Sequence, residues 1–333
     1  MRRRGLVGAA RRPGPVGAAR RPGLVRAARP PGLGGTARRP GLVRAALLLA
    51  LVHGALAAGP AAADPAAWRV EEGRGALWLL GSVHYLRDRD YPLPAVVDRL
   101  YAEADAVLFE IDLDDLEPVA IESALMTAAL LPKGDSLAAE LAPKLYADAS
   151  RRAAQYGLEL QQLDRFEPWL AAITLLDRGM AARGFDANRG VEQYLLGRAA
   201  HDGKEVLGLE TLAAQIAVFD GLSRADQAAL LEQTLAELDS PEDEIGPLID
   251  AWRAGQLDAL ADQLLEDFAD FPTLYERLVV ARNRAWIGEL ERRLAAGERL
   301  LVVVGALHLV GPNSVIELLR RRGHDVEMID AGR

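Results

Sequence analysis

The chain has 333 residues, of which 39 are Lys or Arg and 48 are Asp or Glu, with a formal net charge of −9 and no cysteine. The missing cysteine excludes disulfides, thiolate metal sites, cysteine nucleophiles and lipid attachment through an N-terminal cysteine. Residues 1–63 hold 12 arginines and no acidic residue, which leaves a net charge of −21 on residues 64–333. Such an acidic body should repel nucleic acid and anionic membranes, so we expect neither DNA nor RNA as a partner.

Residues 2–46 are five copies of a nine-residue unit, of which RRPGLVRAA is typical. A repeat of Arg, Pro and Gly cannot bury an apolar core, so it is predicted to be disordered. It is also long for the basic flank of an export signal. We therefore set residues 1–43 apart from the rest and expect the true translation start near Val43.

An export signal is predicted for residues 44–63. A short apolar run is followed by a tract of small residues with Ala-x-Ala sites, which is the order found in secretory signal peptides. The apolar run is shorter than the roughly 20 residues that cross a membrane. Cleavage is expected after Ala63, or alternatively at Ala55-Leu56-Ala57, which leaves a periplasmic or secreted protein with no membrane span.

Residues 64–333 are predicted to form one helix-rich α/β domain with a small mixed or mostly parallel sheet flanked by helices. Apolar runs bounded by turns predict strands at residues 76–84, 106–113, 205–210, 298–308 and 325–329. Leu and Ala at helical spacing predict helices at residues 94–104, 117–180 with breaks, 189–201, 211–297 with breaks and 314–322. No linker divides this part of the chain, and the segment of about 114–200 is predicted as a helical insertion.

Two histidines share one local context. Both follow an apolar strand in a G-x-x-H motif, Gly81-Ser82-Val83-His84 and Gly305-Ala306-Leu307-His308. Ligands of open α/β sheets bind beyond the carboxyl ends of the strands, where both histidines fall, and each glycine permits a sharp turn or close packing. The two histidines are therefore candidate ligands or catalytic groups, whereas His201 and His324 are predicted to be solvent-facing turn residues.

Carboxylates extend this candidate site. Glu110 lies inside the apolar strand VLFEID, where an unpaired charge costs several kcal/mol, and Glu210 closes the strand that ends in GLE. Two imidazoles with one or two carboxylates suit a divalent cation such as Mn, Co or Zn that keeps an open position for water. Glu110 is then a third ligand or the general base, unless it is the partner of a buried arginine. Arg282 or Asn283 supplies that partner or a donor to an oxyanion.

These residues also carry a family resemblance. Five segments are similar to the TraB/GumN family in order and spacing over residues 68–330: GSVHYL with DYPLP, ADAVLFEIDL, KEVLGLET, RNRAW and LVVVGALHLVGPNSVIELLRRRGHDVEMI. The resemblance implies a relationship to the Tiki metal-dependent peptidases and the PrgY-type inhibitors of peptide pheromones. More distantly, it implies one to erythromycin esterases and ChaN-like haem-binding lipoproteins. Carried over to this chain, it implies a site made of His84, Glu110 and His308, with Arg282 and Asn283 as supporting residues and Glu210 as a further member.

Three functions stay open on the sequence. The first is an exported metal-dependent hydrolase, peptidase-like, that cleaves a peptide or small molecule with a site of two histidines and Glu110. The second is a periplasmic protein that binds haem, a metal or a peptide without turnover. In the third, the histidines and Glu110 only stabilise a closed core.

Cell fractionation tests the predicted export. We expect a processed chain that begins near Asp64 in the soluble periplasmic or secreted fraction, because signal peptides are removed on export. N-terminal sequencing measures the cleavage site. A full-length chain in the cytoplasm, or a processed chain that resists alkaline extraction from membranes, would contradict this prediction.

Overall fold

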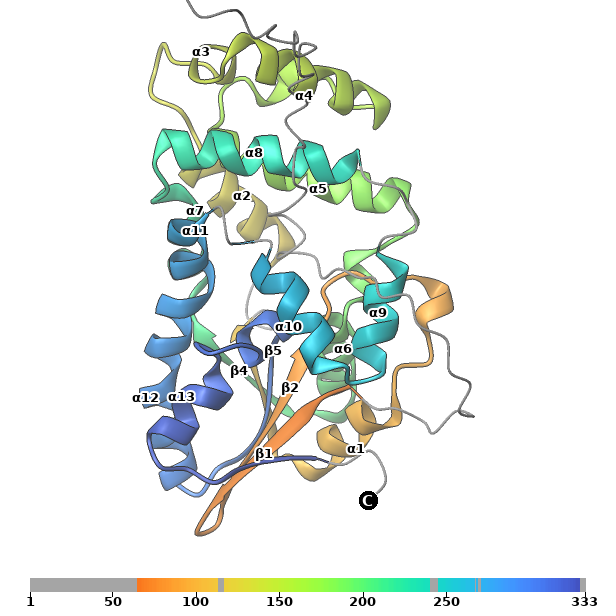
Figure 1. Cartoon of the computed structure of the whole chain (residues 1–333), viewed down its shortest axis with the longest axis vertical. Helices are drawn as coiled ribbons and strands as arrows, with labels where there is room; N and C mark the ends of the chain where they lie inside the picture. Colours follow the sequence, from red (N-terminus) through yellow and green to blue (C-terminus); the bar gives the residue numbers. More distant parts are fainter. Residues whose placement is uncertain (1–64, 113–116, 240–244, 267, 269–270, 330–333) are drawn as a thin grey trace, which may run out of the picture. The chain divides into compact units, whose positions relative to one another are not determined.

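Six strands form one mixed sheet (Figure 1). The structure is a computed structural model that describes residues 65–112, 117–239, 245–266, 268 and 271–329. The repeat and the signal peptide predicted within residues 1–63 lie outside the described residues. The strands are β1 (Ala67–Glu72), β2 (Gly75–Ser82), β3 (Ala106–Ile111), β4 (Glu205–Glu210), β5 (Arg299–Gly305) and β6 (Val326–Met328).

The order of the strands in the sheet is β4-β3-β5-β2-β1-β6. Strands β4, β3, β5 and β2 run parallel, whereas β1 pairs antiparallel with both β2 and β6. Val303 of β5 is in register with Leu80 of β2 and with Phe109 of β3. The carboxyl ends of these three strands therefore lie next to one another at the same edge of the sheet.

The central parallel strands are mostly apolar because both faces of the sheet are covered. All eight residues of β2 are buried. Trp78 and Leu80 belong to the larger apolar core on one face, and Leu77 and Leu79 belong to the smaller core on the other. A continuous apolar run rather than an alternating one is expected for a parallel sheet between two helical layers.

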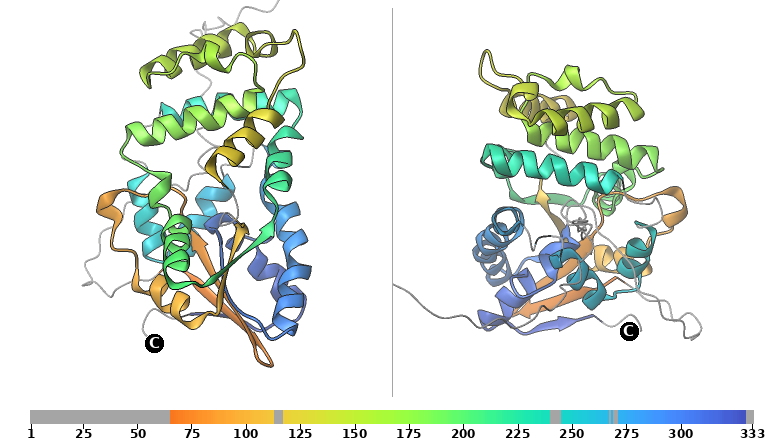
Figure 2. Two further views of the ribbon diagram at one scale, coloured as in Figure 1. Left: turned by 180° about the vertical axis from the view of Figure 1, so that it is seen from behind. Right: turned by 45° about the horizontal axis from the view of Figure 1, so that its top comes forward.

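Helices fill every connection between the parallel strands (Figure 2). The 3₁₀ turn η2 (Asp88–Asp90) and helix α1 (Ala95–Glu103) follow β2. Between β3 and β4 lie α2 (Pro118–Ala128), α3 (Leu137–Glu140), α4 (Pro143–Gln155), η3 (Leu160–Leu163), α5 (Pro168–Ala182), η4 (Ala187–Arg189) and α6 (Val191–Asp202). Between β4 and β5 lie α7 (Leu212–Asp220), α8 (Arg224–Leu238), α9 (Gly246–Arg253), α10 (Leu257–Glu266), α11 (Pro272–Tyr275), the π-helical segment η6 (Glu276–Val280) and α12 (Ala281–Ala295).

The last elements close the smaller core. The 3₁₀ turn η7 (Ala306–Leu309) follows β5, and α13 (Val315–Arg321) precedes β6. Trp286 and Leu290 of α12 pack with Val315 and Leu319 of α13 in the smaller core, while α5 and α8 contribute to the larger one. Within the described residues, no helix is both long and apolar enough to cross a membrane.

Local sequence explains where several helices begin. Ser136, Thr211, Ser223 and Ser314 each accept a hydrogen bond from the backbone N–H three residues later, which satisfies a donor that the first turn leaves free. Pro occupies the first turn of α2, α4, α5, α9 and α11, where its fixed φ suits a helix and its missing N–H is not needed.

The predicted fold class is confirmed, because the chain folds into a mixed sheet flanked by helices. Two details differ from the sequence-based boundaries. Strand β1 was not predicted, because the alternation of Trp68 and Val70 with charged residues, which is typical of a half-buried strand, extends over only a short segment. The predicted strand of residues 298–308 ends at Gly305, and the turn η7 carries His308.

Candidate functional site

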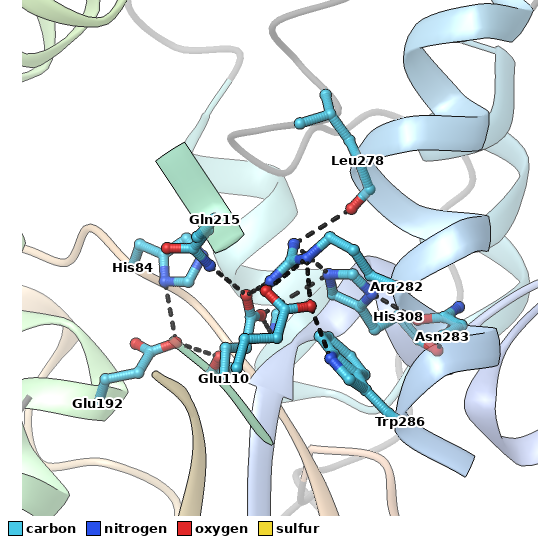
Figure 3. A network of polar contacts seen from close by, with 12 residues as sticks. His84, Glu110, Glu192, Gln215, Leu278, Arg282, Asn283, Trp286 and His308 are labelled. Carbon is cyan, nitrogen blue, oxygen red and sulfur yellow. Dashed lines mark hydrogen bonds and ion pairs between the residues drawn. The ribbon is translucent and has the colours of Figure 1, made fainter. Parts of the chain in front are cut away.

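Three neighbouring strand ends bring together His84, Glu110 and His308 (Figure 3). Glu110 lies near the end of β3, His84 follows β2, and His308 follows β5, which lies between those two strands in the sheet. The sequence predicted all three residues at strand ends, and the order of the parallel strands places those ends at one edge. Ligand sites of open parallel sheets form at this edge.

The three side chains face one small space beside Gly305. A Cβ on Gly305 would lie 3.4 Å from Glu110 Oε1, 3.6 Å from His84 Nε2 and 3.8 Å from His308 Cδ2. The missing side chain therefore leaves a space of about one methyl group among them. We call His84, Glu110 and His308, with Gly305 at their centre, the Gly305 cluster.

The other motif glycine has a packing role. A Cβ on Gly81 would lie 3.2 Å from both Cα and Cβ of Ala306, which is tighter than ordinary van der Waals contact. Trp252 of α9 donates its indole N–H to the Gly81 carbonyl at 2.8 Å. Gly81 thus lets the end of β2 and the turn after β5 approach closely, which brings the two histidine segments together.

Both oxygens of Glu110 are hydrogen-bonded. Oε1 accepts the Gly305 N–H at 2.8 Å, and Oε2 accepts from Arg282 Nη2 at 2.5 Å and from Gln215 Nε2 at 3.1 Å. Burial raises the pKa of Glu110, but His308, Arg282 and His84 outweigh burial and hold this pKa well below its usual range. The carboxylate is therefore ionised at neutral pH.

Arg282 lies between two buried carboxylates. Its Nη2 contacts Glu110, and its Nε donates to Glu210 at 2.9 Å, with both partners about 11–12% exposed. Its Nη1 donates to the Leu278 carbonyl at 3.1 Å and faces His308 Nε2 at 3.3 Å. Burial lowers the pKa of Arg282, but the two carboxylates outweigh it and raise this pKa. Glu110 thus pairs with a buried arginine, Arg282, which is one of the roles that the sequence left open for Glu110.

The backbone before Arg282 is unusual. The five-residue π-helical segment η6 ends at Val280, two residues before Arg282. π-Helical turns are rare and occur frequently at functional sites. Trp286, one turn further along α12, lies under the guanidinium with its ring centre 4.9 Å from Arg282 Cζ and donates its indole N–H to Glu210 at 2.6 Å. Trp286 thus helps to hold the Arg282 guanidinium in place.

His308 is held as a neutral imidazole. Asn283 donates its amide to the Asn313 carbonyl at 2.8 Å, so its Oδ1 is the atom that faces His308 Nδ1 at 2.6 Å and accepts that N–H. Nε2 then carries the lone pair, which suits the facing Arg282 N–H. Burial lowers the pKa of His308 to about 3. His308 therefore lowers the pKa of Glu110 only at the low pH where both groups titrate, and at neutral pH Arg282 and His84 are the positive charges beside Glu110.

His84 has a charged partner instead. Its Nδ1 lies 2.8 Å from Glu192 Oε1, and the same oxygen accepts the Ser82 hydroxyl. The Glu192 carboxylate raises the pKa of His84 to about 9, although burial acts in the opposite direction. The side chain is 49% exposed, compared with 6% for His308. The two matched motifs therefore hold their histidines in different protonation states at neutral pH.

A partly enclosed cavity of about 280 Å³ lies over the Gly305 cluster. His84, Glu110, Arg282 and His308 line it, whereas Asn283 and Glu210 do not. Asn283 is fully buried behind His308, and Glu210 is bound to Arg282 and Trp286. Among the described residues, no three His, Asp or Glu side chains stand close enough together to be recognised as a metal-binding group.

The other two histidines of the described chain lie away from this cavity. His201 is exposed in the last turn of α6. His324 differs from the prediction of a solvent-facing turn residue, because its side chain is only 16% exposed and its Nε2 lies 3.2 Å from Glu291 Oε1. Packing of its loop against the charged face of α12 accounts for that burial.

Sequence reasoning missed Glu192 and Gln215. Glu192 begins α6 and Gln215 lies on α7, both at ordinary helical positions without any motif of their own. Gly190 is a weak signal that could have been noticed. A Cβ there would lie 2.4 Å from the His84 carbonyl oxygen, so only glycine lets α6 begin against the His84 segment and present Glu192 to the imidazole.

Comparison with known proteins gives a family match and two kinds of relative. The sequence profile of the TraB/PrgY/gumN family matches residues 66–328. An uncharacterized protein of Treponema pallidum is 24% identical over 276 residues, which cover 77% of this chain and 80% of that protein. The uncharacterized protein YbaP of Escherichia coli is 26% identical over 243 residues, which cover 73% of this chain and 87% of YbaP. No solved structure matches the chain.

Replacing Glu110 tests the buried ion pair. Glu110→Gln removes the charge that Arg282 faces, so we expect a loss of about 3–5 kcal/mol in the free energy of unfolding, measured in urea. Glu317→Gln is the control, because Glu317 and Arg320 pair at 2.8 Å with both side chains at least 40% exposed. This variant should lose about 1 kcal/mol or less. Equal losses in the two variants would contradict a buried pair.

An NMR titration tests the pairing of His84 with Glu192. In protein kept free of metal, we expect His84 to titrate near pH 9, because the carboxylate stabilises the imidazolium. Glu192→Gln should lower the pKa of His84 toward its ordinary value of 6.5, because the main group that raises this pKa is gone while burial and Arg282 still lower it and only Glu110 still raises it. His84→Gln assigns the resonance. An unchanged pKa in Glu192→Gln would contradict the pairing.

The pair of His84 and Glu192 also determines whether the free energy of unfolding rises or falls with pH. A raised histidine pKa stabilises the native state fully below the unfolded value of 6.5, and this contribution is lost as the pH rises through about 9. The difference in unfolding free energy between the wild type and Glu192→Gln should therefore shrink between about pH 6 and about pH 10. A difference that grows over this range would rule out the charged pair.

Proposed function

Because the chain belongs to the TraB/PrgY/gumN family, we propose that it is a hydrolase of peptides or small molecules whose site holds a divalent cation, Mn, Co or Zn. The proposed ligands are His84, His308 and Glu110. One observation carries the proposal: His84 Nε2 and Glu110 Oε1 both approach the open space at Gly305, and the His308 ring lies beside them.

The partners of the two histidines support a cation there. Metal-binding histidines usually donate their other ring N–H to a carboxylate or carbonyl oxygen, which fixes the ring and its tautomer. His84 Nδ1 has Glu192 as this partner, and His308 Nδ1 has Asn283. In both rings, Nε2 is thus the nitrogen left for a cation, which would displace the proton of His84 Nε2 and the Arg282 N–H that faces His308 Nε2.

The charges around the cluster also favour a cation. Glu110, Glu192 and Glu210 contribute three carboxylates, and Arg282 contributes the one fixed positive charge among these contacts. The group carries a net charge of −1 with His84 charged, and of −2 once both imidazoles are neutral, as metal ligands are. A divalent cation would bind Glu110, which also contacts Arg282, and would neutralise the negative charge of the group.

The surroundings of each side chain indicate its role. When bound, the cation supplies a water of lowered pKa and polarises the carbonyl of the substrate. Glu110 suits a ligand better than a general base, because an effective base has a pKa near the working pH and that of Glu110 lies far below. Arg282 lines the cavity and supplies positive charge for the carbonyl oxygen of the substrate, which becomes negative during hydrolysis. Asn283 and Glu192 orient the two imidazoles.

We also propose that the protein works outside the cytoplasm. The support is the apolar run and the Ala-x-Ala sites of residues 44–63. A periplasmic or secreted location would give the site access to exported peptides and to small molecules from outside.

Thermal melts with Mn, Co or Zn test the cation site. Binding to the native state alone stabilises it by about 2.7 kcal/mol at a hundredfold excess over Kd, so the wild type should melt at a higher temperature with metal. His84→Ala and His308→Ala should lose most of this rise. His201→Ala is the matched control and should keep it, since His201 lies outside the cavity.

Gly305→Ala separates the cation site from fold stability. The added methyl meets its neighbours at ordinary contact distances, so the variant should melt like the wild type without metal. It fills the space between His84 and Glu110, so the metal-dependent rise should disappear and hydrolysis of a peptide mixture, followed by mass spectrometry, should fall by at least about a hundredfold. A normal rise in all three site variants would refute the cation site. A Soret band on haem addition without hydrolysis would favour the alternative of a binding protein.

A further inference from the structure

The cavity over the Gly305 cluster has apolar walls. Its polar residues, His84, Glu110, Gln215 and Arg282 among them, gather where the strands end. Above them, the walls come from six helical elements: α5, α7, α8, α9, α11 and η6. Figures 1 and 2 show α5, α7 and α8 beyond the ends of β2 and β5.

Several large apolar wall residues are only partly buried because they face the cavity. They are Ile173 and Leu176 of α5, Val218 and Phe219 of α7, and Leu278 of η6. Apolar surface left open in this way gains free energy when an apolar group covers it. The cavity volume of about 280 Å³ is nearly twice the roughly 150 Å³ of an apolar cavity that binds benzene.

A second cavity of about 280 Å³ shares three residues with the first, namely His84, Glu110 and Gln215. Glu192 and Gln193 also line it, which makes its wall more polar. The Gly305 cluster therefore lies between an apolar cavity and a more polar one. A molecule bound across the cluster would have an apolar part on one side and a polar part on the other.

We propose that the substrate carries an aliphatic acyl group that fills the apolar cavity and places its amide carbonyl at the Gly305 cluster, with the polar remainder in the second cavity. This substrate class rests on the proposed hydrolase function. Hydrolysis breaks the acyl C–N bond: water adds its oxygen to the carbonyl carbon, and the nitrogen leaves with a proton from the same water. The fatty acid and an amine are the products.

Binding of N-acyl glycinamides tests the acyl cavity without any turnover. Acetyl, butanoyl and octanoyl glycinamide are titrated calorimetrically into protein kept in EDTA, so the result does not depend on a metal or on catalysis. Each methylene that enters an apolar cavity should lower Kd by about fourfold. From butanoyl to octanoyl, Kd should therefore fall by about two orders of magnitude.

A filling variant locates the acyl group. Val218→Phe adds a ring to the wall of the cavity. It should raise the Kd of octanoyl glycinamide by at least about tenfold and change the Kd of acetyl glycinamide little. Val119→Phe is the matched control, because Val119 is 76% exposed on α2 and does not line the cavity. Ile173→Trp fills the cavity from α5 and replaces Val218→Phe if that variant melts at a clearly lower temperature than the wild type.

Each outcome is decisive. A Kd that is independent of chain length, or filling variants that bind like the control, would overturn the acyl cavity even if peptides are hydrolysed. Tight, chain-length-dependent binding without hydrolysis of the bound amide after metal is added would leave the acyl cavity standing and contradict the proposed function.

Discussion

The buried guanidinium of Arg282 is the contact on which the geometry of the site depends. It binds Glu110 from β3, Glu210 from the end of β4 and faces His308 after β5, so one side chain of α12 ties together three neighbouring strands. A buried charge that loses a partner is far more costly than a lost surface contact. Arg282 therefore couples the positions of Glu110 and Glu210. Trp286 adds to this network because its ring packs on the guanidinium and its indole N–H binds Glu210.

The network also decides how the two histidines differ. His308 lies inside it, against Arg282 and Asn283, and burial keeps it neutral with a pKa of about 3. His84 lies at the open side, where Glu192 raises its pKa to about 9. A charged imidazolium and a neutral imidazole thus stand on either side of one ionised carboxylate. Such separation of pKa values among neighbouring groups is more typical of a chemical site than of a closed core.

The helices between β3 and β5 give this site its surroundings. They cover the carboxyl ends of the strands with apolar side chains from α5, α7 and η6, and they leave room for a ligand directly above the polar cluster. An apolar wall strengthens the electrostatic interactions among the polar residues that it covers, because charges are poorly screened next to apolar groups. The same helices thus supply the proposed acyl cavity and the low dielectric in which the cluster would act.

The sequence by itself determined the fold class and indicated which side chains lie at the ends of the parallel strands. Apolar runs separated by helical segments predicted a mostly parallel or mixed sheet, and parallel strands place their carboxyl ends at one edge, so two G-x-x-H motifs and Glu110 were expected to meet. The tertiary structure alone decided which partners they have. Glu192 and Gln215 come from helices without a motif, and only packing against the strand ends brings them to the cluster. Protonation also depends on burial and on charges distant in sequence, which is why two identical motifs hold His84 charged and His308 neutral.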